Sequence, residues 1–129
     1  MPSWDDIRGF LRDHYRVVDD DDRSMGLLME FDNNRRQHIS ISLFEAFDRQ
    51  WIAFETRICR KALLEPAEAC RFNASLVVGS LALDAEDFYV ARHTALLDTM
   101  DLDELMVPIH ALTVLADDLE EKLTGRDLW

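Results

Sequence analysis

Residues 101–125 constrain the fold most, because their apolar side chains recur at spacings of three and four. This spacing predicts a helix whose apolar face consists of Leu102, Leu105, Ile109, Leu112, Ala116, Leu119 and Leu123. Asp101 and Glu104 have the spacing of a capping box at its start, and Gly125 is a stop signal at its end. Pro108 predicts a kink within it. Such a helix needs a broad apolar surface to pack against.

Three segments in the middle of the chain alternate between apolar and polar residues, which predicts strands. They cover residues 25–31, 37–44 and 50–59, with turn-forming residues at 32–34 and 46–49 between them. In the third segment Ile52, Phe54 and Ile58 share one side. Consecutive strands joined by short turns predict an antiparallel meander, which would supply the surface that the last helix needs.

Two further helices and an acidic run flank this meander. Ser3 suits an N-cap, and an apolar stripe predicts a first helix from Trp4 to about Arg16. Four adjacent carboxylates at residues 19–22 predict a loop. Pro66 favours the start of a second helix, which is expected to run to residue 76 or 77 and to end by residue 79.

Two short strands are predicted after the second helix, at residues 80–83 and 88–94, with Leu81 and Leu83 pointing inward. The order of elements is then helix, three strands, helix, two strands, helix. This order predicts a single α+β domain over residues 1–129. We expect a five-stranded antiparallel sheet that carries three helices on one face.

The charge balance limits the class of partner. The chain of 129 residues has a net charge of -12, and 48% of its residues are hydrophobic, which is enough for one core. Such acidity argues against nucleic acid and anionic membranes, and it favours a basic protein partner. No apolar run is long enough for a membrane span, and the first residues do not resemble a signal peptide. We therefore expect a cytoplasmic protein, with Cys59 and Cys70 as reduced thiols.

No pattern predicts catalysis, a metal site or a cofactor. The histidines lie singly, without metal-ligand spacing, at positions His14, His38, His93 and His110. The acidic run at residues 19–22 offers a calcium-loop alternative, but Arg23 stands where that loop needs a ligand. A solvated loop is the simpler interpretation. An enzyme would need converging ionisable groups, which the sequence does not predict.

Some apolar residues of the predicted sheet lie opposite its inward side. Leu28, Trp51 and Ala53 fall on this opposite side. They are covered by a second layer or loop, or singly exposed, or part of a contact surface for another chain. A sheet with helices on one face leaves its other face available for such contact.

Residues 72–125 carry several short motifs. They are Phe72-Asn73 in a helix, Val78-Gly79-Ser80-Leu81-Ala82-Leu83-Asp84, Phe88-Tyr89-Val90-Ala91-Arg92 and Ala116-Asp117-Asp118-Leu119-Glu120. With the order of elements, they resemble the type III secretion chaperone-like fold and, within it, the YbjN-like group of bacterial proteins. The resemblance implies a small acidic homodimer. Secretion chaperones of this fold hold an extended segment of a partner along apolar grooves, without ATP, whereas YbjN-like proteins are described as candidate regulators of sensory transduction.

Our first hypothesis is a non-enzymatic protein-binding module, chaperone-like or regulatory, that acts as a homodimer. It would receive an extended segment of a protein partner at apolar grooves and open strand edges. The candidate partner-binding residues are Leu28, Trp51 and Ala53 on the sheet and Trp4, Phe10 and Leu11 on the first helix. Ordinary packing on the sheet is the alternative for the helix residues. The second hypothesis is a small-ligand-sensing regulatory domain, with a pocket between the sheet and the last helix.

Overall fold

Three α-helices and six strands make up the described part of the chain. The computed structural model describes residues 2–32 and 34–124. Its elements are α1 (Trp4–His14), β1 (Arg16–Asp20), β2 (Ser24–Glu30), β3 (Arg36–Ala46), β4 (Arg49–Arg60), the 3₁₀-helix η1 (Lys61–Leu63), α2 (Pro66–Asn73), β5 (Ser80–Leu83), β6 (Phe88–Leu96) and α3 (Leu102–Thr124). The five predicted strands agree with β2 to β6 to within two residues at each end.

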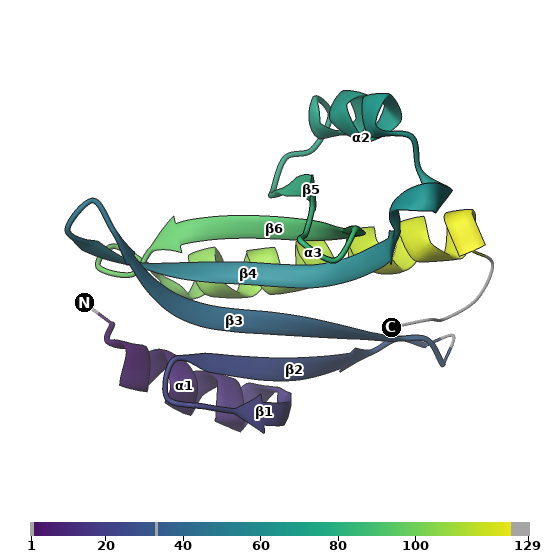
Figure 1. Cartoon of the computed structure of the whole chain (residues 1–129). Helices are drawn as coiled ribbons and strands as arrows, with labels where there is room; N and C mark the ends of the chain where they lie inside the picture. Colours follow the sequence, from purple (N-terminus) through teal and green to yellow (C-terminus); the bar gives the residue numbers. More distant parts are fainter. Residues whose placement is uncertain (1, 33, 125–129) are drawn as a thin grey trace.

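The strands form one antiparallel sheet in the order β1-β2-β3-β4-β6-β5 (Figure 1). The first four strands are a meander, and β6 lies between β4 and β5 because β5 and β6 form a hairpin at the edge. The α+β class with an antiparallel sheet is therefore confirmed, and the prediction of five strands is wrong by one.

The additional strand is β1, which occupies part of the predicted acidic loop. Asp19 pairs with Gly26 and Asp20 with Met25, after a register shift. Arg8 Nη2 and Arg12 Nε of α1 donate hydrogen bonds to the Asp20 carboxylate over 2.9 and 2.8 Å. An edge strand tolerates such charge, because one side of it faces solvent. The loop prediction fails for these two aspartates because the arginines that compensate their charge come from another element.

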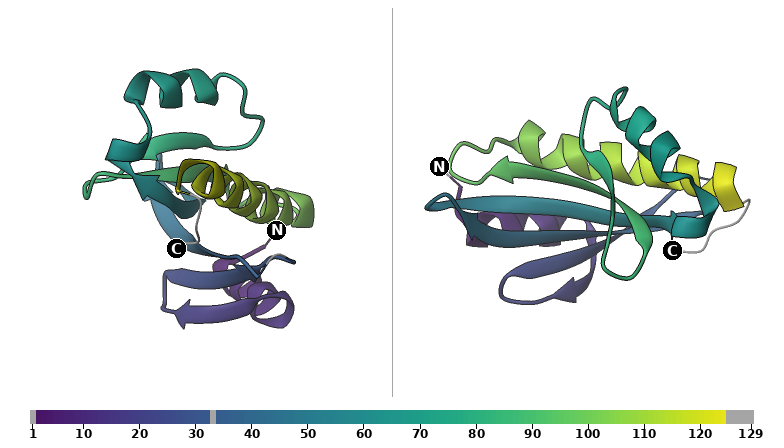
Figure 2. Two further views of the ribbon diagram at one scale, coloured as in Figure 1. Left: turned by 90° about the vertical axis from the view of Figure 1, so that its right-hand side faces the viewer. Right: turned by 45° about the horizontal axis from the view of Figure 1, so that its top comes forward.

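The core lies between the sheet and two helices, α1 and α3, which pack on the same face (Figure 2). We call this the inner face, and the opposite one the outer face. The largest side chains with almost no exposure are Phe54, Leu11, Met25, Leu27, Ile39, Ile41, Ile52, Ile58, Leu97, Leu105, Ile109 and Leu112. The inward orientations predicted for the meander and for most of the last helix are confirmed.

α3 begins as the sequence predicts, with Glu104 N–H donating to Asp101 Oδ1 over 2.8 Å. It continues through Pro108 as one helix to Thr124, and the kink there stays a prediction. Leu102 is 58% exposed, so its predicted place on the buried face is wrong. It lies in the first turn, beside α1, where the sheet does not cover it. The stop signal at Gly125 lies outside the described residues.

α2 differs most from the prediction. It ends at Asn73, because the Asn73 side chain donates to Leu81 O over 3.2 Å and accepts from Leu81 N–H over 2.6 Å. This contact ties the helix to β5, and Figures 1 and 2 show α2 beyond that edge strand, away from α1 and α3. The prediction that all three helices lie on one face of the sheet is therefore wrong for α2. Leu83 is exposed, not inward, since the edge strand has no helix over that residue.

Candidate functional site

A groove lies between α1 and the start of α3, with a volume of about 320 Å³. Its lining is mainly apolar and consists of Pro2, Asp6, Ile7, Phe10, Met100, Asp101, Leu102 and Leu105. Its two carboxylates both cap helices. Asp6 accepts from Ser3 N–H over 3.0 Å, which lowers the pKa of Asp6, and Asp101 caps α3. This α1–α3 groove combines an apolar floor with negative charge at helix starts.

Only one of the three predicted contact residues on α1 lines this groove. Phe10 is half-buried there and stacks on His14, with ring centroids 4.0 Å apart. Trp4 is buried, and its indole N–H donates to Asp22 O over 2.7 Å. Leu11 has no exposed surface. Trp4 and Leu11 therefore belong to the core, and a partner could reach them only if α1 moved.

The predicted sheet residues lie on the outer face, which neither α1 nor α3 covers. Leu28 and Trp51 are half-buried there. Trp51 stacks with Phe44, with ring centroids 6.3 Å apart, and its indole N–H donates to Ala46 O over 2.8 Å. Ala53 is buried by its neighbours, although it faces the same side. The outer face thus offers aromatic surface at the β3–β4 hairpin.

The rest of the outer face is polar. A cavity of about 350 Å³ is lined by His38, Ser40, Glu55, Arg57, Asp84 and Val90. Arg57 pairs with Asp84 over 3.4 Å, and Arg92 pairs with Glu55 over 3.3 Å. The backbone N–H of Phe88 lowers the pKa of Asp84, with smaller help from Arg57. These charged side chains already form ion pairs within the chain, so they are not free to bind a charged ligand in this cavity.

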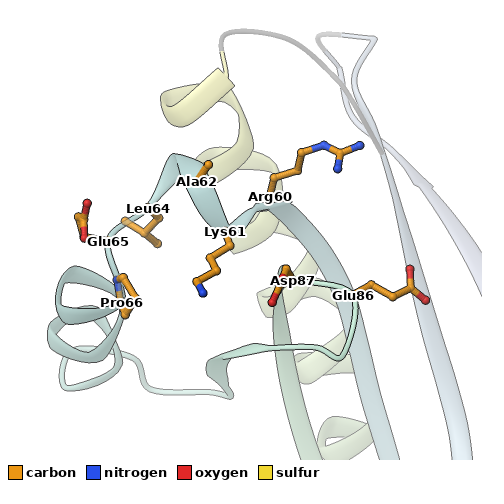
Figure 3. A pocket seen from close by; sticks show the side chains of 8 residues that line it. All are labelled: Arg60, Lys61, Ala62, Leu64, Glu65, Pro66, Glu86 and Asp87. Atoms are coloured by element: carbon orange, nitrogen blue, oxygen red, sulfur yellow. The ribbon is translucent and has the colours of Figure 1, made fainter.

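A third cavity, of about 600 Å³, lies where α2 stands away from the sheet (Figure 3). It is lined by residues 60–66, which run from the end of β4 through η1 to the start of α2, and by the β5–β6 turn: Arg60, Lys61, Ala62, Leu64, Glu65, Pro66, Glu86 and Asp87. Its charges have both signs, and they come from both of these parts of the chain. The cavity follows from the position of α2, and its mixed lining selects no chemical class of ligand.

A fourth cavity lies between β6 and α3, where the second hypothesis places a ligand. It has a volume of about 320 Å³, and its lining consists of Val78, His93, Ala95, Asp101, Asp103, Glu104, Val107 and Pro108. His93 also lies against Phe54, with ring centroids 5.8 Å apart. Burial lowers the pKa of His93, so its imidazole stays neutral at neutral pH.

Within residues 2–32 and 34–124, no three His, Cys, Asp or Glu side chains gather closely enough to hold a metal ion. The side chains of Arg8 and then Arg12 donate hydrogen bonds to Asp20, and these bonds lower the pKa of Asp20. The Asp20 carboxylate is therefore engaged in ion pairs within the chain. Cys59 and Cys70 are free thiols, and burial raises the pKa of Cys59. Among the described helices, none combines the length and apolarity that crossing a membrane requires.

Sequence reasoning missed some residues of the candidate sites. Exposed Leu102 and buried Met100 line the α1–α3 groove, and the position of Leu102 in the first turn of a helix was the available signal. Phe47 lies in the β3–β4 turn and is 90% exposed. An aromatic residue between turn-forming neighbours was the signal there.

No family model and no curated protein matches this chain. Among solved structures, a chain of the HopA1–SchA chaperone–effector complex is similar in fold, with a TM-score of 0.57 and 19% identity, over 88% of each chain. A chain of the ExsC–ExsE complex has a TM-score of 0.62 and 14% identity, over 89% of this chain and 88% of that one. The YbjN-like assignment stays a prediction. The described residues share their overall fold with these two chains, in line with the predicted resemblance to the type III secretion chaperone-like fold.

Proposed function

We propose that this chain is a non-enzymatic protein-binding module, chaperone-like or regulatory, that holds a segment of a partner protein. The observation that carries the proposal is the likeness in fold to chains of the HopA1–SchA chaperone–effector complex and of the ExsC–ExsE complex.

The α1–α3 groove is the site that we propose for a partner side chain. Phe10 and Leu102 form exposed parts of its lining, and an apolar side chain that enters it would leave water. Asp6 and Asp101 line this groove, and the exposed residues Asp5 and Asp103 lie near them in the first turns of α1 and α3. A segment that carries a large apolar residue beside Lys or Arg therefore complements it.

We further propose that the chain acts as a homodimer through the side formed by η1, α2 and β5. Of α2, only Ala69 is buried. Four large apolar side chains are exposed on this side: Leu63, Phe72, Val77 and Leu83. Val77 is 98% exposed. Exposed large apolar side chains on neighbouring elements are typical of an interaction surface, and a second copy would cover them.

The partner-binding proposal is tested by two matched variants of α3. Leu102→Asp puts a carboxylate into the groove, whereas Val114→Asp changes a similarly exposed residue elsewhere on the same helix. We expect the immobilised wild type and Val114→Asp to capture the same protein from a native lysate. Leu102→Asp should lose it, because a charge in an apolar contact is costly to desolvate.

The captured protein is then purified and titrated against each variant by calorimetry, with circular dichroism as a check on folding. Equal affinities for the wild type and Leu102→Asp would contradict the proposed site. If the wild type recovered no protein in stoichiometric amounts, the proposed function would fail.

A second candidate, small-ligand sensing, is favoured by the cavity beside His93. Ala95→Leu would fill this cavity from the sheet side. A metabolite that raises the Tm of the wild type, but not that of Ala95→Leu, would support this function. A broad panel without any shift in Tm would argue against it.

A further inference from the structure

Phe47 combines unusual exposure with an unusual backbone conformation. It is 90% exposed at the tip of the β3–β4 hairpin, with φ of 54°, and Asp48 follows with φ of 59°. Two consecutive residues of positive φ form the tight hairpin turn that favours Asn or Gly at its first position. Phe is a poor choice for this conformation. Neither the turn geometry nor packing in the core therefore explains why an aromatic residue occupies position 47.

Two more aromatic side chains lie directly behind the tip. Phe44 and Trp51 face each other across the two strands on the outer face, and their rings stack at 6.3 Å. The hydrogen bond from the Trp51 indole to Ala46 O fixes the larger ring. Leu96 of β6 pairs with Trp51 on its other side. The tip cluster is defined as Phe44, Phe47 and Trp51. Stacking and this hydrogen bond fix the rings of Phe44 and Trp51, and the ring of Phe47 is exposed beside them at the turn.

The hairpin also offers a short length of open strand edge. The last β2–β3 pair joins Ser24 to Ser42, but β3 continues to Ala46. Leu43 N–H donates to Arg23 O over 2.8 Å. Backbone groups two residues apart in a strand point the same way. The backbone of Glu45 therefore points past the end of β2, where an added extended segment could pair with it.

The β3–β4 tip carries a net negative charge. Arg49 pairs with Asp98 over 3.3 Å, which neutralises both. Glu45 and Asp48 form no ion pair within the described residues, and they leave the tip with negative charge. The whole chain carries -12 as well. A cationic partner is therefore attracted and an anionic one repelled.

We propose that the tip cluster is a second polypeptide-binding site, which takes an extended segment that alternates large apolar residues with Lys or Arg. The inference rests on the proposed function, since it assumes a polypeptide partner. Figure 1 shows the β3–β4 turn at the opposite end of the sheet from α2. The site therefore stays open when two copies associate through α2.

The test uses Phe47→Asn, because Asn suits the turn and removes only the aromatic anchor. Its Tm should rise by roughly 2–6 °C, since the strained Phe is relieved. The probe is a short fluorescent peptide that alternates lysine with phenylalanine, titrated by anisotropy. Its Kd should rise roughly tenfold or more in Phe47→Asn, as for a buried aromatic contact. Val114→Asn, at an exposed position of α3 outside the proposed contact surfaces, should leave the Kd unchanged.

Two control peptides separate the parts of the recognition. Peptides that alternate lysine with serine, or glutamate with phenylalanine, should bind the wild type at least about tenfold more weakly than the probe does. Equal binding of the lysine–serine peptide would reduce the effect to charge and overturn the inference. So would an unchanged Kd in Phe47→Asn.

The remaining outcomes would place the peptide in the α1–α3 groove, or would assign the tip to a second copy or a lipid surface. If Leu102→Asp abolishes peptide binding and Phe47→Asn does not, the peptide lies in the α1–α3 groove, and only this inference fails. If Phe47→Asn weakens peptide binding but no natural partner exists, the tip site stands without the proposed function. A lower mass of Phe47→Asn in light scattering, or loss of binding to phosphatidylcholine vesicles, would assign the tip to a second copy or a lipid surface and overturn the inference.

Discussion

At the scale of single residues, the fold leaves Gly79 little freedom to change. It has φ of +76°, in the link between α2 and β5. A Cβ built there would lie 2.6 Å from Leu112 Cδ2 of α3 and 3.0 Å from Arg92 O of β6. The link thus passes so close to the core that only a residue without a side chain fits.

Gly79→Ala should lower the free energy of unfolding by about 2–3 kcal/mol, from strain in the backbone and overpacking against Leu112. Urea denaturation measures it. Gly9→Ala is the matched control, because no atom lies within 4 Å of a Cβ built at Gly9 in α1. That change should stabilise by about 0.5–1 kcal/mol through helix propensity. Similar effects of the two substitutions would show that Gly79 is not constrained.

Asp84 gives a prediction on pH. Its Oδ1 accepts from the N–H groups of Glu86 and Phe88, each over 2.9 Å, and this holds the pKa of Asp84 below its ordinary 3.8. A carboxyl with a lowered folded pKa stabilises above 3.8, and the contribution is lost as pH falls through the folded value.

Asp84→Asn keeps an acceptor but removes the charge, so its Tm should fall less steeply than that of the wild type between about pH 4 and pH 2. Melting curves recorded by circular dichroism across this range measure the difference. Parallel pH profiles for the two proteins would contradict the assigned role of Asp84.

At the scale of elements, a buried ion cluster joins the end of α3 to the β2–β3 turn. Arg35 Nε contacts Asp117 Oδ1 over 2.7 Å, and Arg35 Nη2 contacts Glu120 Oε1 over 3.1 Å. Both carboxylates are buried. Arg35 and Asp117 are 82 residues apart in the sequence, so the cluster fixes the end of the last helix to a turn from the first third of the chain.

Arg35→Ala should destabilise by about 3–5 kcal/mol, because it leaves buried carboxylates without this cation. Arg16→Ala is the control: Arg16 pairs with Glu30 over 2.6 Å, but both side chains are more than half exposed. Its loss should cost at most about 1 kcal/mol. Urea denaturation of the two variants compares them directly, and equal losses would refute the role of burial.

The elements that the sequence predicts well are those whose own periodicity decides their structure. Strands β2, β3 and β4 alternate because one side of each faces the core, and α3 repeats its apolar spacing for the same reason. β1 is stabilised by Arg8 and Arg12 of α1, and α2 is placed by Asn73 against β5. Such contacts come from distant parts of the chain, and a local pattern does not contain them.

The six predicted partner-binding residues divide into exposed and buried ones, and the sequence pattern does not separate the two groups. Phe10, Leu28 and Trp51 have exposed surface, whereas Trp4, Leu11 and Ala53 are buried. Apolar periodicity identifies which side of an element is apolar, but it does not distinguish packing within the chain from contact with a partner. The α1–α3 groove can be identified only when the relative position of α1 and α3 is known. The tip cluster can be identified only from the turn geometry of Phe47.

At the scale of the whole molecule, the proposed contact surfaces lie on different parts of one sheet. The α1–α3 groove lies on the inner side, the tip cluster at the β3–β4 end, and the exposed residues of α2 beyond β5 (Figures 1 and 2). The proposed positions are compatible with simultaneous binding of a partner segment and of a second copy. An extended segment that reaches both groove and tip would gain affinity from two linked contacts.

Dimerisation through α2 should show in the mass and in its response to salt. One chain has a mass of 15.0 kDa, and light scattering of the wild type at micromolar concentration should give about twice this value. The double variant Phe72→Glu, Val77→Glu should be monomeric, whereas Val107→Glu, at an exposed site on α3, should stay dimeric.

Two copies that each carry -12 repel one another, so added salt should strengthen the dimer, since screening weakens this repulsion. Binding of a cationic segment at the tip cluster should weaken over the same range of salt, because there the charges attract. The opposite signs separate the two contacts in one titration. A wild-type mass near 15.0 kDa at every salt concentration would exclude the dimer and leave the peptide sites untouched.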